Sequence, residues 1–131
     1  NEAVRATIRE ELDKACSIAK SLGGDYEINY ELGYPTTVNN AEVAQIMRQA
    51  AIDLIGEENV IAGKPKTWSE DFAYMAQEAP GCFMFLGAEI EGDTRSHHSP
   101  RFDLNVKGFY IGSAILAETA RRLLAHFDKQ K

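Results

Sequence analysis

The sequence predicts an α/β fold, and three patterns in its 131 residues support this class. Apolar residues recur every three or four positions over 3–22, 41–55 and 108–127, which is typical of amphipathic helices. Residues 25–34 alternate between apolar and polar, which predicts a strand with one solvent-exposed face. The continuous apolar run 82–87 predicts a strand buried on both faces of a sheet.

Helix-ending and helix-starting residues bound these elements. Glycines at 23–24 and at 56 follow the first two helices, where glycine commonly occupies the C-terminal position. Asn39 and Asn40 are both good N-caps for the second helix, and Asn39 precedes Glu42 at the spacing of a capping box. The expected apolar faces are Val4, Ile8, Leu12, Ala15, Ala19 and Leu22; Val43, Ala44, Met47, Ala51 and Leu54; and Gly112, Leu116, Ala120, Leu123 and Phe127, widened by Ile115 and Leu124.

Two shorter elements complete the prediction. Residues 60–62 are a short strand candidate. Thr67 precedes Glu70 at capping-box spacing, which predicts a short helix from about Ser69 to Glu78.

The first helix and strand present a packing problem. A lone helix and strand cannot bury their own apolar faces. Either the strand over 25–34 pairs with later strands, or its partners lie in sequence outside this chain or in another copy. Because exposed apolar faces and strand edges associate, we expect a homo-oligomer.

Composition excludes several classes of protein. The formal net charge is −6 and no basic run is present, which disfavours nucleic acid as a partner. No stretch approaches the roughly 20 apolar residues that span a bilayer, and the first residues do not resemble a signal peptide. Cys16 and Cys82 have no metal or redox spacing, so a reduced, cytoplasmic protein is expected. Because the chain begins in a helical pattern without Met, we expect a piece of a longer protein.

The adjacent histidines mark the first candidate site. His97 and His98 lie in a predicted loop over 88–105, which follows an expected buried strand. On an extended loop one imidazole can point inward while the other faces solvent, and Ser99-Pro100 stiffens the backbone after them. Imidazole is both a common metal ligand and a common general base. We therefore place His98 at the mouth of a site and expect His97 to face solvent or to pack.

The remaining groups near this loop have structural interpretations. Asp103 is expected to fix the loop by capping or by pairing with Arg101, and His126 is expected to be a surface residue near a helix C-terminus. A hydrolytic metal centre needs three or more protein ligands, and no closely spaced partners accompany His98. The sequence also has no Ser/His/Asp constellation, phosphate loop or dinucleotide fingerprint.

A second candidate lies at the start of the short helix. Glu70 and Asp71 are expected near its N-terminus, where capping is the simple interpretation. The functional interpretation is the edge of a site, in which free N–H groups bind a substrate carboxylate or oxyanion and Glu70 contacts a polar group of the substrate.

Five ordered segments resemble a known family. They are 33–39 (GYPTTVN), 69–72 (SEDF), 80–87 (PGCFMFLG), 98–103 (HSPRFD) and the closing helix with Gly112 and Ala114. Together they resemble the C-terminal third of the M20 family of metal-dependent amidohydrolases. The most similar branch includes hippurate hydrolases, N-acyl-amino-acid amidohydrolases and plant auxin-conjugate hydrolases.

The resemblance implies a zinc-peptidase-like fold with two domains. An α/β catalytic domain carries a two-metal centre, and an inserted α+β domain mediates dimerisation and acts as a lid. By this resemblance, residues 1–34 are the last helix and strand of the inserted domain. Residues 35–131 are then the C-terminal part of the catalytic domain.

The resemblance also implies roles for single residues. His98 falls on the family's last metal ligand, whereas His97 occupies a commonly apolar position and receives no ligand role. Ser69, Glu70 and Asp71 fall on a motif near the substrate pocket. The family's Cys/His cluster, adjacent Glu-Glu pair and further histidine all precede this segment, so no catalytic residue is assigned here. The implied cofactor is two divalent metal ions per site, zinc or manganese foremost, with cobalt or nickel also suitable.

The resulting functional prediction is part of a metal-dependent amidohydrolase. Such an enzyme cleaves the amide bond of N-acyl amino acids or related small amides and dipeptides, and this chain alone is expected to be inactive. The alternative is a freestanding, non-catalytic binding or dimerisation module derived from the same fold. The nature of the upstream coding sequence distinguishes the two.

Overall fold

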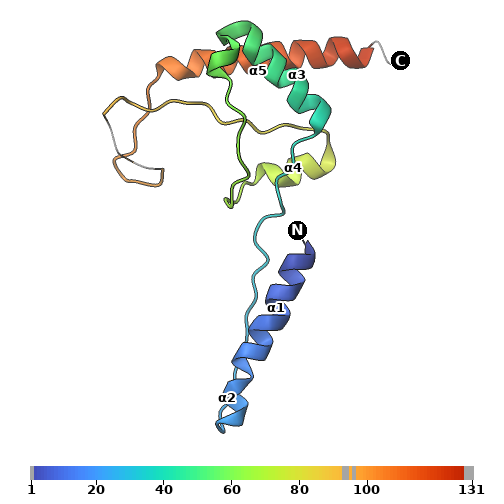
Figure 1. The fold of residues 1–131 in the computed structure, drawn as a ribbon, viewed down its shortest axis with the longest axis vertical. Coiled ribbons are helices and arrows are strands. Elements are labelled where there is room, and N and C mark those ends of the chain that lie inside the picture. The colour runs from blue at the N-terminus through green and yellow to red at the C-terminus, as the bar shows by residue number, and fades with distance from the viewer. Residues whose placement is uncertain (1, 93–94, 96, 129–131) are drawn as a thin grey trace. The chain divides into compact units, whose positions relative to one another are not determined.

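The computed structural model describes residues 2–92, 95 and 97–128 (Figure 1). Its regular structure is helical: α1 (Glu2–Cys16), α2 (Ile18–Ser21), α3 (Ala41–Ile55), the short 3₁₀ helix η1 (Glu57–Asn59), α4 (Phe72–Glu78) and α5 (Lys107–Asp128). The strands predicted over 25–34, 60–62 and 82–87 do not form within these residues. A strand needs a neighbour to complete its backbone hydrogen bonds, and none of the three finds one here. The sheet of the predicted α/β fold is therefore not confirmed.

The chain divides into two compact units, Asn1–Thr36 and Thr37–Lys131. Whether they are the ends of a lid domain and of a catalytic domain stays a prediction. Among the described helices, none is both long and apolar enough to cross a bilayer.

The first unit contains two helices where the sequence predicted one. Ser17 separates α1 from α2, and its hydroxyl donates a hydrogen bond of 2.6 Å to the Lys14 carbonyl. Such side-chain bonds compete with the helical pattern. The glycine stop is confirmed: Gly23 has φ +82°, and the Gly24 amide donates to the Ala19 carbonyl at 2.9 Å. This is the Schellman arrangement, which satisfies the last carbonyls of the helix.

The segment that follows α2 keeps the predicted alternation only over residues 26–30, without forming a strand, and Leu32 and Tyr34 of the expected face are exposed. Tyr26, Ile28 and Tyr30 are half-buried, and the residues between them are exposed. The Tyr26 hydroxyl lies 2.9 Å from Asp13 Oδ1 of α1, and the Arg9 guanidinium lies 5.9 Å from the Tyr30 ring centroid. Side chains of α1 thus contact the half-buried tyrosines of this segment. The α1 residues Val4, Ile8 and Leu12 remain exposed.

The second unit is built on the packing of α3 against α5 (Figure 1). Met47 and Ala51 of α3 and Ile115 of α5 form the buried cluster. Partly buried residues pack around it, namely Ile55, Val60, Cys82, Met84 and Ile111. Two of these come from the predicted strand over 82–87, which therefore contributes its side chains to the core.

The hydrogen bonds at the N-terminus of α3 show which of the two asparagines is the N-cap. The Asn40 side chain accepts hydrogen bonds of 3.1 Å from the amides of Glu42 and Val43, so Asn40 is the N-cap. The capping box predicted for Asn39 is wrong. Asn39 instead bonds the backbone of Phe83: its Nδ2 donates to the carbonyl at 3.0 Å and its Oδ1 accepts from the amide at 2.8 Å. Asn39 therefore acts as the hydrogen-bonding neighbour of the segment at 82–84.

The buried face of α5 agrees with the predicted one in part. Gly112 and Ile115 of the expected face are buried together with Gly108 and Thr119, whereas Leu116, also on the expected face, is 53% exposed. The expected residues Leu124 and Phe127 are also exposed. α3 packs against the side of α5 that carries Ile111 and Ile115.

An aromatic row connects α4, the segment 82–86 and Trp68. Phe72 of α4 lies 5.5 Å from Phe83, which lies 5.3 Å from Phe85, which lies 5.6 Å from Trp68. These distances join ring centroids. Phe85 is 62% exposed, so the prediction of a segment buried on both faces is wrong for this structure.

Candidate functional site

The histidine loop leaves residue 88 and returns at residue 105, where its base is closed. The Asn105 amide donates to the Ala88 carbonyl at 2.9 Å. Asn105 Oδ1 accepts from the Lys107 amide at 3.1 Å and so caps the start of α5. Gly108 fits against this base, because an added Cβ would lie 3.3 Å from the Ala88 Cβ and from the Gly87 carbonyl oxygen. Both ends of the loop are thus fixed to the helix that packs on the core.

His98 has an unusual, left-handed backbone conformation. Its φ is +65°, and no other non-glycine residue of the described chain has a positive φ. The left-handed region costs an ordinary residue about 1–2 kcal/mol, so it persists only where surrounding contacts stabilise it. The imidazole itself is exposed. A strained backbone under an exposed, ligand-type side chain is a common property of functional positions.

His97 packs within the loop. Its ring lies 4.9 Å from the Phe102 ring, centroid to centroid, at an interplanar angle of 32°. Between these residues a turn is closed by the Phe102 amide, which donates to the Ser99 carbonyl at 3.0 Å. The Ser99 hydroxyl also accepts from the Arg101 amide at 3.2 Å. Pro100 occupies the second turn position, which its fixed φ favours.

Asp103 helps to fix the loop, although with a different partner from the one expected. Its carboxylate lies 3.8 Å from the Arg95 guanidinium, and its Oδ1 accepts from the Leu104 amide at 2.8 Å. Arg95 also donates to the Arg101 carbonyl at 2.7 Å. Arg95, and not the predicted Arg101, is therefore the basic residue that pairs with Asp103.

The segment with Ser69, Glu70 and Asp71 lies just before α4. Ser69 and Asp71 are exposed and Glu70 is half-buried. The predicted helix start at Ser69 is wrong: α4 begins at Phe72, and the Asp71 side chain makes no capping bond. The Glu70 carbonyl accepts from the Ala73 amide at 3.2 Å, so this turn is held by its backbone. The side chains of the acidic pair are left for other contacts.

The two candidate segments are not joined to each other by direct contacts. Over the described part of the chain, no hydrogen bond, ion pair or ring contact links residues 69–71 with 97–98. Nor do any three His, Cys, Asp or Glu side chains of that part gather as a metal site. Burial raises the pKa of the Cys82 thiol, which packs beside the core cluster.

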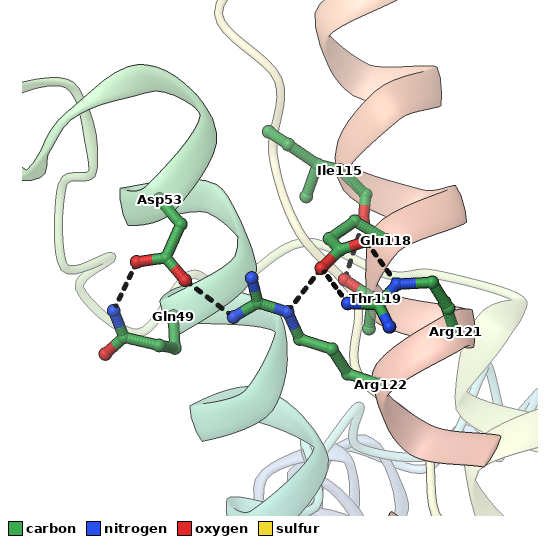
Figure 2. A network of polar contacts seen from close by, with 7 residues as sticks. All are labelled: Gln49, Asp53, Ile115, Glu118, Thr119, Arg121 and Arg122. Atoms are coloured by element: carbon green, nitrogen blue, oxygen red, sulfur yellow. Dashed lines mark hydrogen bonds and ion pairs between the residues drawn. The ribbon is translucent and has the colours of Figure 1, made fainter. Parts of the chain in front are cut away.

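The largest pKa shift among the described residues belongs to Glu118 of α5, in a charged network that Arg122 extends to Asp53 of α3 (Figure 2). Hydrogen bonds from Arg121 and then Arg122 lower the pKa of Glu118 from 4.5 to about 2. Hydrogen bonds from Gln49 and then Arg122 lower the pKa of Asp53. These shifts follow from a charged network that joins the two helices, so they indicate a structural role here and not a catalytic one.

Comparison with known proteins identifies the family. The model of peptidase family M20/M25/M40 matches residues 2–122. The chain belongs to this family. No solved structure matches it.

Three relatives of this M20 chain show the kinds of enzyme that it resembles. It is 37% identical over 123 residues to "Putative amidohydrolase YhaA" of Bacillus subtilis (strain 168), a match that covers 92% of this chain and 31% of the relative. It is 34% identical over 93 residues to IAA-amino acid hydrolase ILR1-like 5 of Arabidopsis thaliana, covering 70% and 21%. It is 33% identical over 104 residues to N-acetyl-L-cysteine deacetylase of Bacillus subtilis (strain 168), covering 79% and 24%. The chain thus spans less than a third of the length of these relatives, and they support a hydrolase as its parent enzyme.

Several contacts around the site of the M20 chain have no clear signal in its sequence. Asn39 and Phe83 are 44 residues apart, and Glu42 Oε1 lies 2.7 Å from Nε2 of His126, 84 residues away. A sequence pattern reports neighbours along a helix or strand, so pairs at such separations are invisible to it. The Arg95–Asp103 pair is closer in sequence, and its opposite charges at the two sides of the histidines were the one available signal.

Proposed function

We propose that this chain is the C-terminal part of a metal-dependent amidohydrolase that cleaves N-acyl amino acids or related small amides and dipeptides. The observation that carries the proposal is the family match over residues 2–122, together with relatives named as amidohydrolases and deacetylases. The enzyme's substrate is accordingly a small molecule. Two free cysteines, Cys16 and Cys82, suit a reducing, cytoplasmic location.

His98 is the residue of this chain that we assign to the metal centre. Its exposed imidazole is a suitable donor for zinc, manganese, cobalt or nickel. One imidazole does not make a two-metal site, and the described residues add no further ligands around it. The chain therefore does not fit the metal pair by itself, and we assign no step of the hydrolysis to its residues. We further propose that the isolated chain is inactive.

Ser69, Glu70 and Asp71 are proposed to contact the polar groups of the substrate. Their side chains lie on an accessible turn held by backbone hydrogen bonds, which leaves the hydroxyl and carboxylates available. The Trp68 ring, which is 62% exposed, adjoins them.

The test requires the complete coding sequence upstream of Asn1. The protein that it encodes is assayed for hydrolysis of N-benzoylglycine and N-acetylcysteine, after removal of metal and after addition of zinc or manganese. We expect metal-dependent activity, a loss of at least about 100-fold for His98→Ala, and little change for His126→Ala, whose ring pairs with Glu42. An inert full-length protein would contradict the proposed activity, and an active His98→Ala variant would contradict the ligand role. Tight stoichiometric metal binding with amidase activity in the 131-residue chain would contradict its inactivity.

A second proposal concerns association between copies, whether the chain is part of an enzyme or a freestanding module. Val4, Ile8 and Leu12 form an exposed apolar stripe on α1. We expect the chain to form homo-oligomers through this stripe, as measured by light scattering coupled to size-exclusion chromatography. Ile8→Glu is expected to shift the distribution to monomer, whereas Ile61→Glu, at a side chain that is 89% exposed and outside the stripe, is not. A wild-type chain that stays monomeric at high concentration would contradict the proposal.

A further inference from the structure

The two adjacent histidines differ in backbone and in contacts, and the differences are connected. His97 stacks on Phe102, whereas His98 next to it holds the left-handed conformation and exposes its ring. The stack spans the residues between, so the left-handed position lies inside the loop that the two rings close. A change in the His97–Phe102 contact is therefore expected to alter the backbone conformation of His98, and the reverse.

Few backbone dihedral angles can vary in the turn after His98. Two hydrogen bonds to Ser99, from the amides of Arg101 and Phe102, fix the backbone over 99–102. Pro100 fixes its own φ and biases Ser99 toward an extended conformation. The dihedral angles at His98 are then the main determinants of where the His97 ring lies relative to the Phe102 ring. Moving φ of His98 from +65° to the ordinary negative region would swing His97 away from its partner.

The energetics favour the same connection. A left-handed histidine needs a compensating contact, and the ring stack beside it is one such contact. The stack lies at the surface, since His97 is exposed and Phe102 is 39% exposed, so it is not needed for the core. The Arg95–Asp103 pair restrains the outer flanks of the same loop.

We propose that the His97–Phe102 stack positions His98, so that the first histidine anchors the loop and the second presents its imidazole for metal binding. The proposal rests on the ligand role of His98 given above, and it assigns His97 a positioning role. In this arrangement His97 acts through its flat ring and not through its nitrogens. Replacement of His97 by another aromatic residue should therefore preserve the function, whereas loss of the ring should not.

The first arm of the test needs no metal. In the ¹⁵N- and ¹³C-labelled 131-residue chain, a positive φ brings the His98 amide proton close to its own Hα and gives a strong intraresidue NOE. We expect this NOE in the wild type, in His97→Phe and in Phe102→Tyr, and its weakening in His97→Ala and Phe102→Leu. Phe127→Leu is the matched control, because it removes the other histidine–phenylalanine contact, between His126 and Phe127 at 5.3 Å.

The second arm uses the protein encoded by the complete coding sequence, because the described residues of this chain supply no further ligands beside His98. It follows the imidazole signals of His97, His98 and His126 during titration with Co²⁺. We expect His98 to respond at the lowest concentration, and Phe102→Leu to need roughly two- to tenfold more Co²⁺ for the same response. His97→Phe and Phe127→Leu should match the wild type. Far-UV circular dichroism confirms that each variant keeps its helices.

The possible outcomes separate the two proposals. If the NOE of His98 is unchanged in Phe102→Leu and His97→Ala, the positioning role is wrong. If His97→Phe weakens the Co²⁺ response as much as His97→Ala does, His97 acts through its nitrogens and the positioning role is also wrong. If the NOE depends on the stack but His98 shows no preference for Co²⁺ over His126, the positioning stands and the ligand role of His98 is contradicted.

Discussion

Arg122 of α5 lies 2.8 Å from Asp53 of α3, and its guanidinium also lies 2.7 Å from Glu118 one turn earlier on its own helix. Figure 2 shows this arginine between the two carboxylates. The hydrogen bonds to Glu118 and Asp53 raise the pKa of Arg122, so its guanidinium stays protonated at any ordinary pH. A second polar contact, between His126 Nε2 and Glu42 Oε1 at 2.7 Å, joins the same helices. The helix pair that supports the histidine loop is therefore held by charge at its edge as well as by apolar packing.

The first prediction compares two neighbouring arginines. Arg122→Gln is expected to lower the urea midpoint of unfolding, because it removes the bridge between α3 and α5 and leaves Asp53 and Glu118 without this partner. Arg121→Gln is the control, since Arg121 bonds Glu118 within α5 and is 69% exposed. Exposed pairs contribute little, so the control should have a smaller effect. Equal midpoints for the two variants would show that the bridge to Asp53 does not stabilise the pair.

The second prediction concerns acid stability. The arginine hydrogen bonds place the folded pKa of Glu118 at about 2, below its ordinary value of 4.5. A group whose pKa is lower in the folded state stabilises the fold fully above its unfolded pKa, and the contribution is lost as the pH falls through the folded value. The difference in unfolding free energy between wild type and Glu118→Gln should therefore be largest near about pH 6 and shrink toward about pH 2. Glu57→Gln, in an exposed pair with Arg48, is the comparison, and a gap for Glu118→Gln that does not vary with pH would contradict the assignment.

The third prediction compares two neighbouring residues of α5. Ile115 is 3% exposed and packs in the core cluster with Met47 and Ala51, whereas Leu116 is 53% exposed. Ile115→Ala should cost about 2–5 kcal/mol of unfolding free energy, because it leaves a cavity in the core. Leu116→Ala should change it by no more than about 0.5 kcal/mol. Urea denaturation measures both, and a larger loss for Leu116→Ala would mean that Leu116, and not Ile115, packs in the core.

Helix positions in this chain followed from local signals in the sequence. The three long apolar periodicities correspond to α1, α3 and α5, and the glycine at 56 ends α3 with a φ of +83°. These features depend on residues within one or two turns of each other, so a sequence pattern contains what is needed. Where two signals competed, as with Asn39 and Asn40, the pattern did not decide between them. The choice depended on Phe83, far along the chain.

Strands and buried faces were harder to predict because they depend on partners. Alternation over 25–34 gave the correct half-buried side chains at Tyr26, Ile28 and Tyr30 but not at Leu32 and Tyr34, which are exposed, and a ladder needs a second strand. The apolar run at 82–87 contributes Cys82 and Met84 to the core and leaves Phe85 exposed, because α3 and α5 cover only one side. For the candidate site, the sequence singled out both histidines but could not show that His97 contacts Phe102 or that His98 is left-handed. Both features arise from the three-dimensional course of the loop.

The last prediction concerns Asn39, whose side chain forms two hydrogen bonds with the backbone of Phe83. Asn39→Ala removes the acceptor for the Phe83 amide and the donor for its carbonyl, so it should cost about 1–3 kcal/mol of unfolding free energy. Asn39→Asp keeps an acceptor for the amide and loses the donor to the carbonyl. Hydrogen exchange should therefore show a faster Phe83 amide in Asn39→Ala than in Asn39→Asp.

Asn40→Ala is the matched control for this measurement. It removes the cap of α3 and should cost about 0.5–2 kcal/mol, with faster exchange at the Glu42 and Val43 amides and no selective change at Phe83. The two adjacent asparagines then have separate exchange signatures, because one caps a helix and the other pairs with an extended segment. Protection of the Phe83 amide that survives Asn39→Ala would show that another group holds this segment, and the role of Asn39 as its hydrogen-bonding neighbour would be wrong.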